Sequence, residues 1–298
     1  MNMHLKRIGF SRGLVSALVL AIALIGSVAR VSAARPGSSA SSVSVKDAVP
    51  APAASCAVKP TIVLVHGAWA NAASWNGEID RLQSDGYAVR AFANPLRGLT
   101  SDAANLSDFL STISGPIVLV GHSYGGAVIT NAAAGNPHVK ALVYVDALAP
   151  AVGETVAELS GATSALRAPA GTLYDVIPYP AASGGDQLLY LKERVFLQSF
   201  GPDVPTRTAQ ALWASQTPAA TSAFTTPTVA AAWKTIPSWY VIGTADRIVT
   251  PASELMMAHR ARAHILMVPG GSHLTLISHP TKVTDQIVAA AQATCSSG

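Results

Sequence analysis

The sequence contains little charge, few aromatic residues and only two cysteines. Of its 298 residues, 12% are charged and 6% are aromatic, whereas 50% are hydrophobic. Disordered chains and coiled coils need far more charge, so this composition excludes both. The 23 glycines and 19 prolines follow no three-residue period, which excludes a collagen-like chain. The length suits one large α/β domain, or two small ones, with a hydrophobic core.

The positive charge of the chain is concentrated at its N-terminal end. The net charge is +4, and residues 1–33 contain Lys6, Arg7, Arg12 and Arg30 but no acidic residue. The rest of the chain therefore has equal numbers of basic and acidic residues. No nucleic acid partner is expected, because binding a polyanion requires an excess of basic groups.

Residues 1–33 have the three parts of a secretory signal peptide. A basic head precedes an apolar run from Leu14 to Val28, and small residues up to Ala33 offer a cleavage site. The alternative is an uncleaved anchor, but the run is short for a bilayer span of about 20 residues. We expect an exported protein, periplasmic or secreted, with no stable membrane anchor after cleavage. Residues 34–58, rich in Ala, Ser, Val and Pro, are expected to form a flexible leader.

The two cysteines, Cys56 and Cys295, lie at opposite ends of the predicted domain. In an oxidising compartment such a pair is expected to form a disulfide, and the alternative is two unpaired small hydrophobic residues. A ring of this length adds up to roughly 5 kcal/mol of stability. Neither cysteine has the Cys or His neighbours of a metal site, and no two histidines have metal-ligand spacing. No metal is therefore expected.

Short apolar runs alternate with helical segments over residues 59–298, the predicted folded domain. Runs that are apolar on both faces are typical of central parallel strands, and they lie at 61–65, 117–120, 141–145, 239–242 and 264–268, with a weaker one at 87–92. Helices are predicted at about 74–85, 102–113, 124–134, 251–260 and 281–293. This order predicts an α/β fold with a doubly wound, mostly parallel sheet. Residues of about 148–235 show helical patterns and no convincing strand, which predicts an inserted helical cap.

The motif Gly121-His122-Ser123-Tyr124-Gly125-Gly126 lies between a predicted strand and a predicted helix. This context is typical of a nucleophile elbow of the form Gly-x-Ser-x-Gly. The two glycines remove side chains that would clash in the tight turn, which lifts the Ser123 hydroxyl clear of the sheet. The following helix directs its N-terminal N–H groups at the site and favours negative charge there. We predict that Ser123 is a nucleophile rather than a capping serine in a glycine-rich turn.

A serine nucleophile needs a base and a group that orients the base. In a strand–helix fold of this kind, an acid and then a histidine should follow later strands. Asp246 follows the strand 239–242 and His273 follows the strand 264–268, so both lie at carboxyl ends of parallel strands, where such sheets place their sites. Asp146, which follows the strand 141–145, is the alternative acid.

A glycine loop after the first predicted strand is expected to stabilise the oxyanion. The loop is His66-Gly67-Ala68-Trp69, and Gly67 lets the backbone bend toward the serine. The predicted donors are the backbone N–H groups of Ala68 and Tyr124, and each such donor is worth roughly a hundred- to a thousandfold in rate. His66 is expected to brace the loop by hydrogen bonds.

These motifs resemble those of the α/β-hydrolase superfamily, from about residue 60 to residue 294. Trp69 and Trp75 make the chain similar to its compact branch of plant methylesterases, hydroxynitrile lyases and bacterial esterases. The resemblance implies that the chain cleaves a carboxylic ester through an acyl-enzyme, with no cofactor. The lyases carry a threonine after the loop histidine and a lysine after the catalytic histidine, where this chain has Gly67 and Leu274.

The predicted substrate is a small or medium, mostly apolar ester. The pocket is expected to include Trp69, Leu148, Phe196, Trp213 and Leu274, although cap aromatics could instead form the core between cap and sheet. No cluster of Arg or Lys that would clamp an anionic substrate is visible in the sequence. Two alternatives stay open: lyase-like or perhydrolase activity on the same triad, and a ligand-binding member of the fold without catalysis. No feature of the sequence indicates an oligomeric state.

Overall fold

The computed structural model describes residues 58–179 and 185–295. The predicted signal peptide, nearly all of the leader and Cys56 lie outside the described residues, so export and the disulfide stay predictions. Among the described residues, no helix combines the length and the hydropathy needed to cross a bilayer.

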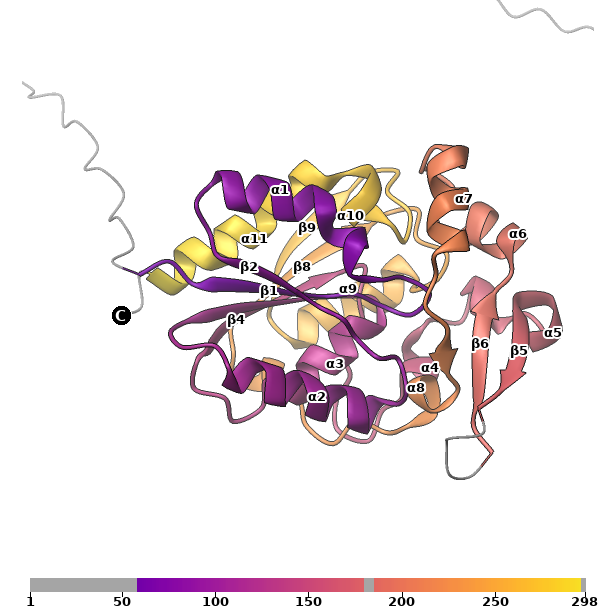
Figure 1. Cartoon of the computed structure of the whole chain (residues 1–298), viewed down its shortest axis with the longest axis horizontal. Coiled ribbons are helices and arrows are strands. Elements are labelled where there is room, and N and C mark those ends of the chain that lie inside the picture. Colours follow the sequence, from indigo (N-terminus) through magenta and orange to yellow (C-terminus); the bar gives the residue numbers. More distant parts are fainter. Residues whose placement is uncertain (1–57, 180–184, 296–298) are drawn as a thin grey trace, which may run out of the picture. The chain divides into compact units, whose positions relative to one another are not determined.

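A six-stranded sheet forms the centre of the described domain (Figure 1). Its strands, in spatial order, are β2 (Val89–Phe92), β1 (Thr61–Val65), β3 (Ile117–His122), β4 (Val139–Val145), β8 (Ser238–Gly243) and β9 (His264–Val268), and every neighbouring pair is parallel. All residues of β3 and β8 are buried, as expected of strands covered on both faces. The predicted doubly wound α/β fold is confirmed.

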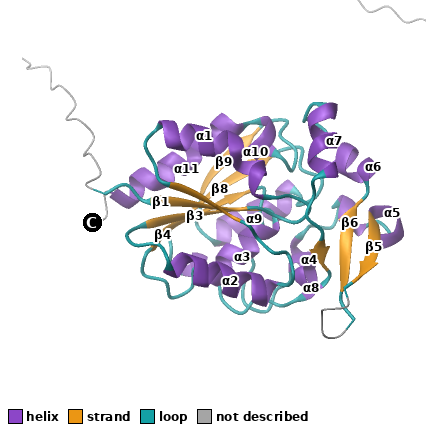
Figure 2. Ribbon diagram, viewed as in Figure 1, coloured by secondary structure: helices purple, strands orange, loops and turns teal. Residues whose placement is uncertain are grey.

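Helices cover both faces of this sheet (Figure 2). On one face α1 (Asn76–Ser84) packs against α11 (Pro280–Cys295), and on the other α2 (Leu99–Ser111) packs against α3 (Tyr124–Ala132). The remaining helices outside the cap are η1 (Ala72–Trp75), α9 (Pro251–Arg260) and α10 (Thr275–Ser278).

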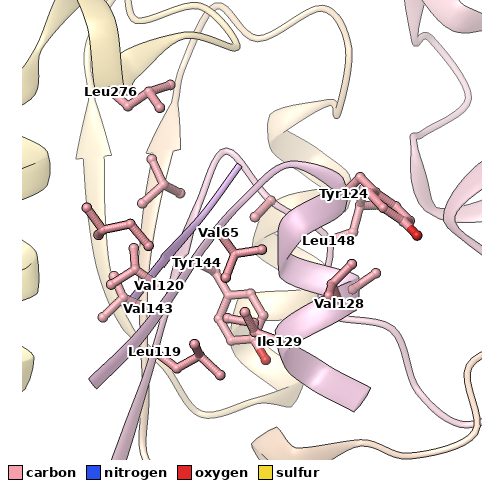
Figure 3. Close-up of a cluster of buried hydrophobic side chains, with 14 of the residues drawn as sticks. Val65, Leu119, Val120, Tyr124, Val128, Ile129, Val143, Tyr144, Leu148 and Leu276 are labelled. Carbon is pink, nitrogen blue, oxygen red and sulfur yellow. The ribbon is translucent and has the colours of Figure 1, made fainter. Parts of the chain in front are cut away.

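Buried side chains of the sheet and of α3 form the hydrophobic core beneath the elbow (Figure 3). Val65, Val120 and Val143 come from three neighbouring strands, and Ile129 comes from the helix. Each side chain of this size stabilises the fold by roughly 1.5–3 kcal/mol when it is fully buried. The elbow therefore joins a strand and a helix, β3 and α3, that this packing holds in place.

The inserted cap, over residues of about 148–235, contains strands as well as helices. Its helical segments are α4 (Val156–Leu159), η2 (Ala165–Arg167), α5 (Ala170–Leu173), α6 (Glu193–Val195), η3 (Phe196–Phe200), α7 (Thr206–Ala214), α8 (Ser222–Thr225) and η4 (Ala232–Lys234). A second, antiparallel sheet is formed by β5 (Tyr174–Pro178), β6 (Gln187–Leu191) and β7 (Ala219–Ala220). The expectation that this insertion contains no strand is therefore wrong. β5 and β7 give no apolar run in the sequence, because β5 is largely exposed and β7 is only two residues long.

Candidate active site

The elbow around Ser123 has a strained backbone that requires its glycines. Ser123 lies between β3 and α3 with φ of 53° and ψ of −124°, a conformation that non-glycine residues rarely adopt. A Cβ atom on Gly121 would lie 2.6 Å from the carbonyl oxygen of Gly125, and one on Gly125 would lie 2.4 Å from that of Val65. Only glycine fits at these two positions, which explains why the motif has this form.

The structure brings Ser123, His273 and Asp246 into contact. Nε2 of His273 lies 2.8 Å from Oγ of Ser123, and Nδ1 of His273 lies 2.6 Å from Oδ2 of Asp246. The carboxylate accepts a hydrogen bond from the N–H at Nδ1. Nε2 therefore carries no proton and can accept a hydrogen bond from the serine hydroxyl. Each residue follows the carboxyl end of a different parallel strand, which is how residues distant in the sequence meet at one edge of the sheet.

The carboxyl group of Asp246 is buried but well supplied with donors. Besides the imidazole, the backbone N–H groups of Ile248 and Val249 donate to its Oδ1 at 2.6 and 3.1 Å. Burial raises the pKa of Asp246 well above its usual range, and the nearby carboxylate of Asp203 adds to the rise, while these two backbone hydrogen bonds oppose it. The N–H groups therefore favour the ionised form that holds His273.

The imidazole of His273 is fully buried, and this burial lowers its pKa to about 3. Desolvation penalises the charged form, so the ring is neutral at neutral pH. A neutral ring with Nε2 facing a hydroxyl is the state that a general base requires.

Asp146, the alternative acid, makes contacts of a different kind. Its carboxylate accepts hydrogen bonds from the N–H of Gly243 at 2.9 Å and from the N–H of Thr275 at 3.0 Å, and it also accepts one from the Thr275 hydroxyl. These bonds join the end of β4 to β8 and to the start of α10. Asp146 therefore shapes the floor of the site, while Asp246 contacts the imidazole.

Among the described residues, three acidic side chains lie close enough together to be tested as a cation site. Oxygen atoms of Asp146, Asp246 and Glu254 all lie within 4.8 Å of one another, and all three side chains are buried. The hydrogen bonds described above already occupy the oxygens of both aspartates. Burial also raises the pKa of Glu254, and a proton on this group relieves the repulsion between the carboxylates.

The glycine loop closely approaches Ser123. A Cβ atom on Gly67 would lie 2.6 Å from Cβ of Ser123. Nδ1 of His66 donates to the carbonyl of Gly67 at 3.0 Å, and its Nε2 accepts the N–H of Asn94 at 3.1 Å. His66 thus braces the loop as predicted, and burial lowers its pKa to about 4, which keeps the ring neutral.

Ser123 faces a cavity of about 190 Å³ between the sheet and the cap. Most of its lining is apolar, and the lining residues are Trp69, Ser123, Tyr124, Leu148, Val156, Ala157, Ser160, Leu166, Arg167, Tyr174, Leu189, Thr221, Phe224, Ile248 and Val249. Trp69 stacks with Tyr174 at 5.5 Å and with Phe224 at 5.3 Å between ring centroids. Three aromatic rings therefore form one continuous wall of the cavity.

Only part of the predicted pocket lies on this cavity. Trp69 and Leu148 line it, whereas Phe196 and Leu274 line a second, smaller cavity that Trp69 separates from it. Phe196 stacks on Phe200, and Leu274 lies at the start of α10, so neither lines the cavity beside Ser123. Trp213 lines neither of these two cavities, and its indole N–H donates to the carbonyl of Leu191 within the cap.

The sequence analysis missed several lining residues. Ile248 and Val249 could have been found, because they are the apolar residues two and three positions after the predicted acid, and the structure shows that their N–H groups bind it. Tyr174 begins β5, a strand that the sequence did not indicate. Its place beside Trp69 depends on tertiary contact.

Comparison with solved structures gives the same fold. Polyneuridine aldehyde esterase aligns with a TM-score of 0.67 at 15% identity, covering 78% of this chain and 99% of that one. An extracellular alpha/beta-hydrolase from a Paenibacillus species aligns with a TM-score of 0.64 at 23% identity, covering 78% and 98%. A variant of tomato methylketone synthase I aligns with a TM-score of 0.66 at 18% identity, covering 80% and 99%. At these identities the likeness shows the fold alone.

Sequence comparison gives the family. The carbendazim hydrolyzing esterase of Nocardioides sp. (strain SG-4G) is 32% identical over 110 residues, which are 33% of this chain and 46% of that protein. The match thus spans less than half of the relative. A family model described as alpha/beta hydrolase family matches residues 62–286, which is most of the chain. Because that match includes the elbow, the acid and the histidine loop, the protein belongs to the alpha/beta hydrolase family.

Proposed function

We propose that this protein is a serine esterase that cleaves a small or medium, mostly apolar carboxylic ester. The observation that carries the proposal is the continuous contact from Ser123 Oγ through His273 to Asp246, at 2.8 and 2.6 Å. The similarity to an esterase supports the same chemistry. The apolar cavity beside Ser123 supports an apolar substrate.

The mechanism uses His273 first as a base and then as an acid. His273, oriented by Asp246, takes the proton of Ser123 as Oγ attacks the ester carbonyl. The backbone N–H groups of Ala68 and Tyr124 bind the oxyanion, and the close approach of Gly67 to Ser123 supports this assignment. His273 then protonates the departing alcohol and activates the water that hydrolyses the acyl-enzyme.

The residue after the proposed base favours hydrolysis over the lyase alternative. In hydroxynitrile lyases, which this chain resembles, a lysine there supports the release of cyanide. Here Leu274 occupies the position, and its side chain is 2% exposed. The site therefore offers no cation at that point, whereas ester cleavage needs none.

A panel of p-nitrophenyl esters of increasing chain length tests the proposal, together with labelling by a fluorophosphonate probe. We expect the protein to hydrolyse short or medium esters and to be labelled. Ser123→Ala should lower kcat by about a million-fold and abolish labelling. A wild-type protein that binds esters but neither turns them over nor reacts with the probe would show that it is a binding member of the fold.

A further inference from the structure

A carboxylate of the cap reaches the loop that carries His273. Asp203 lies between η3 and α7, and the loop lies between β9 and α10. Oδ2 of Asp203 accepts the backbone N–H of Ser272 at 3.0 Å, and Oδ1 accepts the hydroxyl of the same serine. Both oxygens thus bind the residue that directly precedes the proposed base.

The same cap segment makes two further contacts with this loop. The ring of Phe200 meets the imidazole of His273 edge to face, with centroids 4.8 Å apart and planes at 75°. A Cβ atom on Gly201 would lie 2.6 Å from Cδ1 of Leu274. Three successive residues of the loop, from Ser272 to Leu274, therefore contact residues of one short cap segment, Phe200 to Asp203.

Other anchors of the loop come from the α/β core. Nε2 of His122 donates to the carbonyl of His273 at 2.8 Å, and Thr275 donates to Asp146. The core also holds the loop before the imidazole, where the N–H of Ala245 donates to the carbonyl of Gly271 at 2.8 Å. At Ser272 itself, Asp203 of the cap supplies the acceptor for both the N–H and the hydroxyl. Ser272 is fully buried, and a charged acceptor makes stronger hydrogen bonds than a neutral one.

We infer that Asp203 is a positioning residue for His273, so that docking of the cap sets the place of the base. The inference rests on the proposed function. Asp203 does not line the substrate cavity or contact the reacting atoms. Its hydrogen bonds reach the loop through Ser272, and its negative charge also raises the pKa of Asp246. A catalytic group displaced by about 1 Å can lose a hundredfold in rate, so a small movement of this loop is sufficient to matter.

Substitutions at both ends of the contact test the inference in the full-length protein. Asp203→Ala removes both acceptors, Asp203→Asn keeps one carbonyl oxygen, and Ser272→Ala removes the hydroxyl but keeps the N–H. Asp175→Asn is the matched control, because Asp175 is an exposed cap carboxylate paired with Lys192. On the best p-nitrophenyl ester, we expect Asp203→Ala to lower kcat by about ten- to a hundredfold. KM should change little, because the cavity is untouched.

The kcat effects should be graded. The kcat of Asp203→Asn should lie between those of Asp203→Ala and the wild type. In the double variant, the loss in kcat should be smaller than the product of the two single losses, because the hydroxyl hydrogen bond is removed by either substitution and only the N–H hydrogen bond is left for Asp203→Ala to remove. Asp175→Asn should match the wild type. Equal losses in kcat for Asp203→Ala and Asp175→Asn, or a change in KM alone, would overturn the inference.

A spectroscopic measurement follows the base without any substrate. The Nδ1 proton of His273, shared with Asp246, should give a far-downfield proton resonance that His273→Ala removes. In Asp203→Asn and Ser272→Ala this resonance should shift or broaden. An unchanged resonance in both variants would contradict the inference even if the protein hydrolyses no ester. A wild type that shows the resonance but no turnover would instead contradict the proposed function alone.

Discussion

Individual residues of the site act by keeping the imidazole neutral and the serine exposed to the cavity. Burial disfavours the charged form of His273, and the Nδ1 contact with Asp246 fixes which nitrogen faces Ser123. His122 also holds this loop in place, because its Nε2 donates a hydrogen bond to the carbonyl of His273. The proposed reactivity of Ser123 is therefore a property of its surroundings.

The pH dependence of catalysis follows from the low pKa of His273, about 3. Catalysis needs the neutral ring, so protonation of His273 should lower activity only as the pH drops through this pKa, below the usual histidine range near 6.5. A fall in activity at a pH above this pKa would come from protonation of Asp246, whose pKa is raised by burial. We expect kcat/KM to be flat from neutral pH down past 6.5. Circular dichroism at each pH separates this limb from acid unfolding, and a limb centred at or above 6.5 would contradict the expectation.

The glycine loop has no room for a side chain beside the nucleophile. We expect Gly67→Ala to lower kcat by about a hundredfold or more, because its Cβ atom would lie 2.6 Å from that of Ser123 and displace the oxyanion donors. Stability should fall by about 1–3 kcal/mol. Gly171→Ala, in a cap helix with nothing within 4 Å of the added carbon, is the control. Kinetics and thermal melts of the two variants test this, and wild-type activity in Gly67→Ala would refute it.

At the scale of elements, the carboxyl ends of the parallel strands supply the chemistry and the cap supplies the cavity wall. Ser123, Asp246 and His273 follow β3, β8 and β9. Tyr174 begins β5 and Phe224 lies in α8, and both stack on Trp69. Selectivity should therefore change with cap residues while the proposed catalytic residues stay in place.

Phe224→Leu tests this division of roles. A smaller side chain widens the cavity beside Trp69, so kcat/KM should rise for longer acyl chains relative to acetate. The ratio should shift by about tenfold or more, the effect of one methylene group in an apolar pocket. Val229→Ala, at an exposed cap position, should leave the ratio unchanged. An unaltered ratio in Phe224→Leu would place the acyl chain elsewhere.

At the scale of the whole molecule, two predictions concern the ends of the chain. Export should remove residues 1–33, and an oxidising compartment should then join Cys56 to Cys295. We expect a mature protein whose intact mass lacks the signal peptide and rises by about two hydrogens on reduction. Reduction should lower the melting temperature, by up to the roughly 5 kcal/mol that such a ring supplies. In Cys295→Ser, reduction should have no such effect, and an unchanged mass on reduction of the wild type would exclude the bridge.

The central elements could be predicted because each is specified locally. The runs at 61–65 and 117–120 lie in β1 and β3, and the helix at 251–260 agrees with α9. Strands covered on both faces must be apolar throughout, so they are recognisable without their partners. Of the cap strands, β6 contains the apolar run Leu188–Leu191, which the sequence analysis missed. β5 could not be found in this way, because it is largely exposed and obtains its order from pairing with β6.

The amino-acid sequence alone was sufficient to predict a parallel sheet, the elbow, and the serine, acidic residues and histidine that are candidates for the site. Each of these depends on short-range patterns: a buried run, a turn that only glycine permits, and a polar residue directly after a strand. The tertiary structure decided that Asp246 rather than Asp146 contacts His273, which rings line the cavity and that Asp203 reaches Ser272. These contacts join residues from separate elements, and their distances depend on how the cap and the sheet pack together.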